Sequence, residues 1–174
     1  MNYFASISIA FVLLIGLSSC TTEKNSFGVE PYEVTEAGLQ WYKIEDLETM
    51  ENIADRTVLV DMYTSWCGWC KKMDKNTFTD PNVVDYLNEH FVPVKFNAER
   101  KDPVTWKGET YETVRMGRRG TNGLAVKLLD GRLGYPSLVY LDGSNLEKIT
   151  KVPGYKTPDQ LLNDLRSVST PRSS

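Results

Sequence analysis

The run TVLVDMYT, residues 57–64, constrains the fold more than any other segment of the chain. It is rich in β-branched and apolar residues and does not alternate with polar ones, which is typical of a strand buried on both faces. Such a strand needs neighbouring strands at its edges and helices above and below it. The run therefore predicts an α/β protein with this strand near the centre of a covered sheet.

Segments of strand and helix character alternate on either side of this run. Strands are expected at 39–44 and 91–98 and, as a hairpin, at 137–141 and 146–152, and helices at 45–54, 69–76, 81–90 and 158–168. The connection 99–135 is longer than a crossover requires, and we expect helical pieces in it at 111–117 and 124–129. This order predicts a central mixed β-sheet flanked by helices, with an insert before the last hairpin.

The amino-terminal residues differ in composition from the rest of the chain. Residues 1–19 have no charged side chain and end in small residues, which is typical of an export signal. The segment LSSC, ending at Cys20, resembles the lipobox of bacterial lipoproteins, and this resemblance implies cleavage before Cys20 and acylation of its thiol. A plain secreted protein and an uncleaved anchor are the alternatives. We expect a polar tether at 20–38, one domain at 39–168 and a polar tail at 169–174.

Two of the three cysteines, Cys67 and Cys70, directly follow the central strand and open the next expected helix. Unpaired N–H groups and the positive end of the helix dipole favour a thiolate at the first of them. The second lies one turn further along, close enough to close a small disulfide ring. The spacing predicts that Cys67 attacks a disulfide and that Cys70 resolves the mixed disulfide.

The cysteine pair has three alternative uses. A structural zinc site needs four ligands, and with Cys20 assigned to the anchor only the pair and His90 remain. A static disulfide stays open, because exported compartments are often oxidising. A copper site that adds Met73 or His90 to the two thiolates is the third alternative.

Two segments resemble the thioredoxin superfamily. VLVDMYTSWCGWCKKM, residues 58–73, is similar to its active-site region, with an Asp six residues before the first cysteine, and GYPSLVYLD, residues 134–142, is similar to its cis-proline loop. An acidic residue seven after the first cysteine and the segment TFTDP add a resemblance to the C-terminal domain of the periplasmic thiol reductase DsbD and to stand-alone thioredoxin-like lipoproteins. The resemblance implies a thioredoxin fold.

The resemblance also implies roles for single residues. Cys67 becomes the attacking thiolate and Cys70 the resolving thiol. Asp61 becomes the buried carboxylate that accepts and returns the proton of the resolving thiol, and Asp74 a second acidic modulator. We expect these four residues to be catalytic.

Five further residues are expected to meet the substrate. Trp66 and Trp69 would supply an apolar surface around the exposed sulfur, although ordinary packing is an alternative for both. Tyr135 and Pro136 would offer their backbone to the substrate chain. Gly68 and Trp69 stand where thioredoxin has Gly-Pro, so the direction of electron flow does not follow from the motif.

Together these observations predict a lipid-anchored, extracytoplasmic thiol-disulfide oxidoreductase of the protein-disulfide reductase type. Its partners would be disulfide-containing exported proteins, a membrane thiol-electron donor and the membrane itself. No organic cofactor or metal is implied, and a net charge of −3 with interspersed signs gives no reason to expect nucleic acid. The alternatives are a disulfide oxidase or isomerase, and a non-catalytic binding module. The insert arginines Arg115, Arg118 and Arg119 are interpreted as surface charge, with an acidic partner as the alternative.

Overall fold

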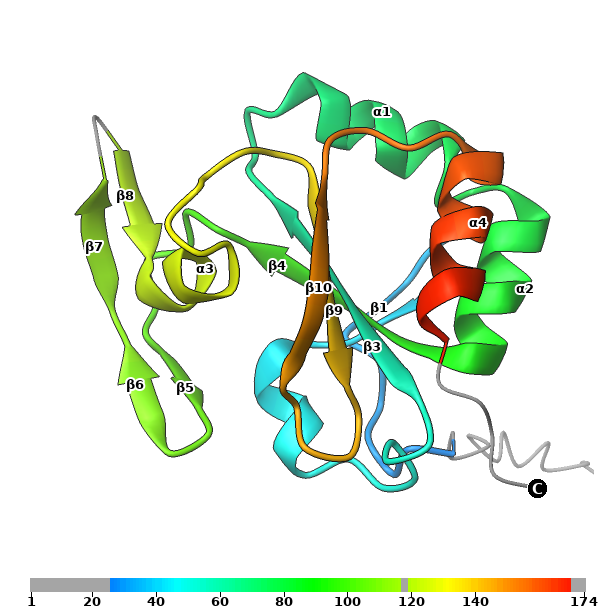
Figure 1. The fold of residues 1–174 in the computed structure, drawn as a ribbon, viewed down its shortest axis with the longest axis horizontal. Coiled ribbons are helices and arrows are strands. Elements are labelled where there is room, and N and C mark those ends of the chain that lie inside the picture. The colour runs from blue at the N-terminus through cyan, green and yellow to red at the C-terminus, as the bar shows by residue number, and fades with distance from the viewer. Residues whose placement is uncertain (1–25, 117–118, 170–174) are drawn as a thin grey trace, which may run out of the picture.

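Residues 26–116 and 119–169 are described by a computed structural model (Figure 1). The expected export signal at 1–19, the expected lipid-attachment residue Cys20, Arg118 and the tail residues 170–174 lie outside the described residues. Within the two described ranges, no helix has the length and apolar character that a membrane crossing requires.

A four-stranded mixed sheet with the order β10-β9-β3-β4 forms the centre of the structure. Its strands are β3 (Thr57–Tyr63), β4 (Phe91–Asn97), β9 (Ser137–Asp142) and β10 (Lys148–Pro153). β3 pairs in parallel with β4 and antiparallel with β9, and β10 pairs antiparallel with β9. The predicted central strand and mixed sheet are confirmed, and β3 is apolar on both faces because an apolar cluster covers each of them.

Three of the predicted α-helices are confirmed, two with the predicted bounds and one that begins one residue earlier. They are α1 (Gly68–Asn76), α2 (Pro81–His90) and α4 (Pro158–Val168). The Asp80 side chain caps α2 by accepting the backbone N–H of Asn82 and Val83, and Thr157 caps α4 by accepting that of Gln160. Figure 1 shows α2 and α4 side by side on one face of the sheet, with α1 above them.

Alternate residues of β3 supply two separate apolar clusters, one on each face of the sheet. Val58 and Val60 belong to the cluster that the insert and the N-terminal elements cover. Leu59 belongs to the cluster that also contains Met73 of α1 and apolar residues of α2 and α4. Because side chains alternate along a strand, Asp61 lies on the same face as Leu59, the face that α1 covers.

The insert at 99–135 contains one helix rather than the two predicted. Its elements are β5 (Val104–Trp106), β6 (Glu109–Tyr111), β7 (Thr113–Met116), β8 (Arg119–Asn122) and α3 (Gly123–Leu128). The prediction at 124–129 is confirmed, with the Asn122 side chain accepting the backbone N–H of Leu124 as cap. The prediction of a helix at 111–117 is wrong, because β5 pairs with β6 and β7 pairs with β8 as antiparallel hairpins. The β-branched residues Thr113 and Val114 favour this outcome.

The N-terminal residues pack on the domain from Phe27 onward, although we expected a tether up to residue 38. Phe27 is buried, and its ring meets the ring of Tyr42 edge-on at 5.4 Å. Short strands β1 (Glu33–Val34) and β2 (Gln40–Trp41) pair antiparallel. The helix expected at 45–54 is a shorter 3-10 helix, η1 (Ile44–Glu48). Asn52, with a φ of 57°, has a left-handed backbone that an α-helix does not accept.

Candidate redox-active site

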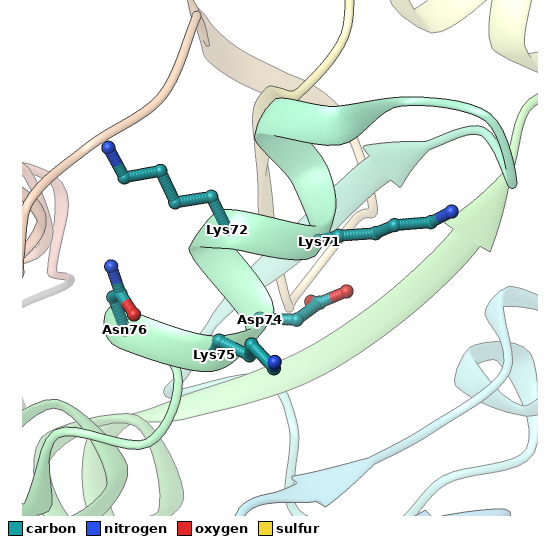
Figure 2. Close-up of a pocket in the computed structure, with 5 residues that line it drawn as sticks. All are labelled: Lys71, Lys72, Asp74, Lys75 and Asn76. Carbon is teal, nitrogen blue, oxygen red and sulfur yellow. The ribbon is translucent and has the colours of Figure 1, made fainter.

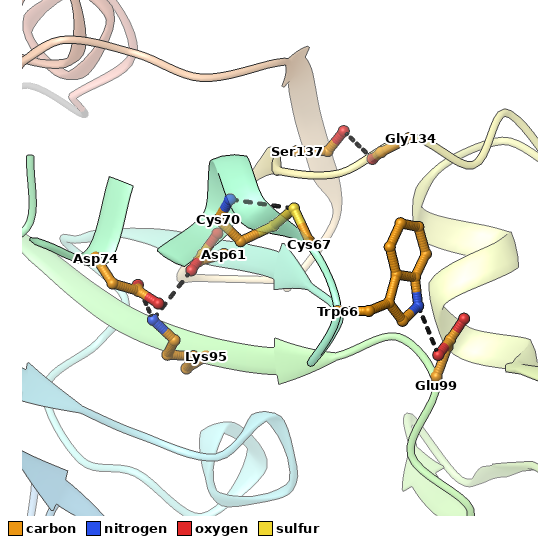
Figure 3. Close-up of a disulfide and its surroundings, with 9 residues drawn as sticks. All are labelled: Asp61, Trp66, Cys67, Cys70, Asp74, Lys95, Glu99, Gly134 and Ser137. Carbon is orange, nitrogen blue, oxygen red and sulfur yellow. Dashed lines mark hydrogen bonds and ion pairs between the residues drawn. A yellow bond between two sulfur atoms is a disulfide. The ribbon is translucent and has the colours of Figure 1, made fainter. Parts of the chain in front are cut away.

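Cys67 and Cys70 lie at the start of α1, at the end of β3, and form a disulfide with each other. Cys67 is the N-cap residue of α1, and its Sγ accepts the backbone N–H of Cys70 at 3.1 Å (Figure 3). Both cysteines are largely buried, at 4% and 3% exposure, whereas we expected an exposed sulfur at Cys67. The Cys67 sulfur therefore lies where helix N–H groups stabilise negative charge, the position that the sequence predicted for it.

Asp61 lies in the middle of β3 and is 2% exposed. Its Oδ2 atom is 3.4 Å from Nζ of Lys95, and Figure 3 shows its carboxylate turned toward that ammonium. Its Oδ1 atom is buried and has no hydrogen-bond partner among the described residues. Burial raises the pKa of Asp61 to about 6, an effect that Lys95 opposes and Asp74 reinforces.

Lys95 joins the two acidic residues that the sequence predicted. It lies directly opposite Asp61 in the parallel register of β3 and β4, and its ammonium also forms an ion pair with Asp74 of α1. Burial acts to lower the pKa of Lys95, but the two carboxylates outweigh it and raise that pKa above its ordinary value. The ammonium thus stays charged between a buried carboxylate and a half-exposed one. We did not predict Lys95, although it is the single charge in the apolar run FVPVKFNA.

Trp66 lies on the opposite side of Cys67 from this charge cluster. Its Nε1 donates to Oε2 of Glu99 at 2.9 Å, as Figure 3 shows. The Arg119 guanidinium lies 5.2 Å from the centre of the ring, and Tyr135 meets the ring edge-on at 6.3 Å. The ring is still 53% exposed. Trp66 is therefore held in one orientation while one surface stays open to solvent.

Trp69, inside the C-x-x-C motif, is also exposed, at 57%. Its ring lies 5.5 Å from that of Tyr155, and Nζ of Lys72 lies 4.8 Å from its centre. Between the two tryptophans, a Cβ added at Gly68 would meet no atom within 4 Å. The surface in front of the motif is therefore open, and packing does not require glycine there.

The loop before β9 contains the cis peptide that the sequence predicted. The Tyr135–Pro136 bond is cis, and the Pro136 carbonyl accepts the backbone N–H of Gly154 at 2.8 Å. The Ser137 hydroxyl donates to the carbonyl of Gly134 at 2.7 Å (Figure 3). The cis geometry is confirmed, and contact of Tyr135 and Pro136 with a substrate stays a prediction.

A shallow hollow of about 500 Å³ follows the outer face of α1 (Figure 2). It is lined by residues of α1 alone: Lys71, Lys72, Asp74, Lys75 and Asn76. Figure 2 shows the Lys71 and Lys72 side chains diverging from the helix. The hollow contains neither cysteine, so we interpret it as the solvated face of the helix. The described residues include no group of three or more His, Cys, Asp or Glu that could hold a metal ion.

A family model described as a thioredoxin-like domain matches residues 45–169. The chain belongs to the thioredoxin-like family. The matched residues of this thioredoxin-like domain include the central sheet, the cysteine pair, the insert and the final helix. The predicted family and fold are thereby confirmed.

Curated relatives of the thioredoxin-like domain are named thiol:disulfide interchange protein DsbD. The protein of that name from Pectobacterium atrosepticum is 28% identical over 127 residues, which cover 72% of this chain and 19% of the relative. The one from Pseudoalteromonas atlantica is 31% identical over 91 residues, which cover 51% of this chain and 14% of the relative. The chain therefore matches less than a fifth of the length of these two proteins.

Solved structures resemble the thioredoxin-like domain in fold. The solution structure of a thioredoxin from Thermus thermophilus superposes with a TM-score of 0.52 and is 21% identical, and the match covers 75% of this chain and 86% of that thioredoxin. At this identity the similarity establishes the shared fold alone. It supports the predicted arrangement of a mixed sheet covered by helices on both faces.

Proposed function

We propose that the protein is a thiol-disulfide oxidoreductase that reduces protein disulfides through Cys67 and Cys70. The observation that carries the proposal is the position of the Cys67 sulfur, which caps α1 and accepts the backbone N–H of Cys70. A helix N-terminus lowers the pKa of a cysteine and so favours the reactive thiolate. The name of the DsbD relatives, thiol:disulfide interchange protein, supports the same chemistry.

The first step is attack by the Cys67 thiolate on one sulfur of a substrate disulfide. The substrate S–S bond breaks, a mixed disulfide forms between Cys67 and that sulfur, and the other substrate sulfur leaves as a thiolate that takes a proton from water. In the second step Cys70 loses its proton and attacks Sγ of Cys67. This forms the Cys67–Cys70 disulfide, the form that the structure describes, and releases the second substrate thiol. Two electrons pass from the dithiol to the substrate.

Asp61 is the proposed base for the second step. Its side chain lies on the face of β3 that α1 covers, and α1 contains Cys70. Burial raises the pKa of Asp61 to about 6, so the carboxylate is mostly ionised at neutral pH. Because this pKa lies close to neutral pH, the carboxylate can accept a proton and return it. Lys95 is a positioning residue that holds the carboxylate by an ion pair at 3.4 Å. Asp74 forms an ion pair with the same ammonium, and its side chain is partly exposed to solvent.

The amino-terminal sequence supports a proposed setting for this reaction. The segment LSSC supports an anchor in which Cys20 carries lipid, with the folded domain on the extracytoplasmic side of the membrane. Exported proteins would then supply the disulfides, and a membrane dithiol would reduce Cys67 and Cys70 again after each cycle.

Replacing Cys20 with Ala should abolish acylation without changing the redox activity of the domain. Membrane retention of this variant with an intact apolar segment would favour the uncleaved anchor.

Reduction of insulin with dithiothreitol as electron source tests the proposed activity. We expect the chain to accelerate insulin precipitation and the Cys67→Ser variant to give only the uncatalysed rate. An unaccelerated rate with the wild-type chain would overturn the proposal and favour a non-catalytic binding module. Equilibration with reduced and oxidised glutathione then measures the reduction potential of the Cys67–Cys70 pair, which indicates the direction of electron flow. A reductase should have a potential near that of thioredoxin, about −270 mV, whereas a value near −120 mV would indicate an oxidase.

A further inference from the structure

One face of the β7–β8 hairpin in the insert lies beside Trp66 of the redox site. In the β7–β8 hairpin Val114 lies opposite Thr121, and Met116 lies opposite Arg119. Residues opposite one another share a face, as do residues two apart on one strand, so these four side chains share one face of the hairpin. Val114 and Met116 are among the exposed large apolar residues of the described chain.

This hairpin face forms one wall of a groove of about 340 Å³. Met116 and Arg119 line it from the hairpin, and Leu133 and Tyr135 line it from the cis-proline loop. Trp66, the residue immediately before the attacking cysteine, also lines it. The groove therefore includes the residue next to Cys67 in the chain, so a polypeptide joined to the Cys67 sulfur can extend into it.

The charged groups that line the groove already have partners there. Glu99 accepts the Trp66 Nε1–H at 2.9 Å, and its carboxylate lies 3.6 Å from Nη1 of Arg119. Two exposed large apolar side chains also line the groove: Trp66, with one open side of its ring, and Met116, which is 37% exposed. A ring held in one orientation and a flexible thioether together suit a large apolar side chain, because little entropy is lost at the ring and the thioether adapts to different shapes.

We propose that this groove receives a large apolar side chain of the disulfide-bearing polypeptide, next to the cysteine that Cys67 attacks, and that the β7–β8 hairpin determines this preference. The proposal rests on the proposed disulfide exchange, because the mixed disulfide brings the polypeptide to the groove. A strand advances about 3.3 Å per residue, so a side chain within one or two residues of the attacked cysteine reaches a site beside Trp66. The insert is thereby a specificity element of the reductase.

Two disulfide peptides that differ at one position test this proposal. Each peptide has one cysteine in a mixed disulfide with glutathione, followed by Phe in one peptide and Ser in the other. With the reduced full chain in a single turnover, we expect the second-order rate constant for the Phe peptide to be about tenfold that for the Ser peptide, since even one methylene in an apolar pocket discriminates by roughly 10- to 200-fold. Oxidised glutathione is a reference substrate, because it has no large apolar side chain that could bind in the groove.

Met116→Ser should reduce the ratio of the two rates to about twofold or less, as expected when the apolar contact is lost. The ratio does not depend on the fraction of folded enzyme, because both peptides meet the same preparation. The matched control is Ile149→Ser on β10, which removes a residue of similar exposure, 47%, outside the groove and should keep the tenfold ratio.

Equal rates for the two peptides with the wild-type chain would overturn the groove proposal, as would a tenfold ratio that persists in Met116→Ser. A dimer in solution that Met116→Ser dissociates would also overturn it, because a second copy would then cover the groove. If the chain reduces neither oxidised glutathione nor the two peptides, the proposed disulfide exchange is contradicted, and the groove proposal that rests on it is contradicted too. The glutathione measurement therefore separates the two failures.

Discussion

The two flanks of the disulfide have opposite physical character. On the inner flank, Asp61 is buried and paired with Lys95, so the pKa of each of these two groups depends on burial and on the charge of the other. On the outer flank, Trp66 is held by Glu99 but stays half-exposed, so it presents a surface rather than a titrating group. We therefore propose that the inner flank controls protons and that the outer flank controls which polypeptide reaches the sulfur.

The largest expected effect separates the two cysteines that the flanks share. Cys67→Ser should abolish exchange with disulfides, whereas Cys70→Ser should still attack but accumulate stable mixed disulfides. The measurement is mass spectrometry of the reduced variants after incubation with oxidised glutathione. Accumulation of the mixed disulfide in Cys67→Ser instead would reverse the assigned roles.

A large effect on rate should follow a change on the inner flank. Asp61→Asn keeps the shape of the side chain and removes the base, so we expect the resolving step to slow by about 100-fold near neutral pH while the attack by Cys67 changes little. Stopped-flow exchange from pH 6 to 9 separates the two steps. The matched control is Asp85→Asn on the exposed face of α2. Wild-type rates for both steps throughout this range would show that the proton leaves Cys70 by another route.

The same substitution should change stability in a pH-dependent way. The pKa of Asp61 is raised in the folded state from 3.8 to about 6, so the folded state holds this proton more tightly than the unfolded state. The free energy of unfolding therefore falls as pH rises from about 4 to 6, and the ionised carboxylate costs on the order of 2–3 kcal/mol at neutral pH.

Asp61→Asn should accordingly be more stable than the wild-type chain at pH 7 by about 1–3 kcal/mol, and the difference should vanish below about pH 4. Urea unfolding at several pH values measures this difference, with Asp85→Asn again as the control. A variant that is equally stable at pH 7, or less stable, would contradict the raised pKa of Asp61.

The inner flank was largely predictable from the sequence, because its signals are local. Asp61 interrupts an apolar strand and the cysteines follow it directly, so a few consecutive residues define the strand, the helix start and the buried acid. Lys95 was missed because its partnership with Asp61 depends on pairing between strands that lie far apart in the sequence. Its isolation among apolar residues was the available signal.

The outer flank was predicted only in part. The cis peptide at Pro136 and the exposure of Trp66 agree with expectation, but the hairpin that completes this flank was read as a helix. Tyr111 and Val114 are spaced three apart, as on a helix face, whereas Thr113 and Val114 favour strands. In such short segments the pairing of β7 with β8 decides the outcome, and single-sequence patterns do not contain it.

The smallest expected effect concerns the residue that holds Trp66. Glu99→Gln keeps an acceptor for the indole N–H but removes the charge that attracts Arg119, so the ratio of Phe-peptide to Ser-peptide rates should fall about twofold. The control is Glu109→Gln, which removes an ion pair with Lys127 elsewhere in the insert. An unchanged ratio would mean that Glu99 does not position the ring.

The central claim is that the Cys67 sulfur, at the start of α1, is the reactive thiol of the reduced protein. Alkylation with limiting iodoacetamide at neutral pH, followed by peptide mass spectrometry, measures the rate at each cysteine separately. We expect Cys67 to be modified at least tenfold faster than Cys70, because helix N–H groups favour its thiolate. Faster alkylation of Cys70 than of Cys67 would contradict the account.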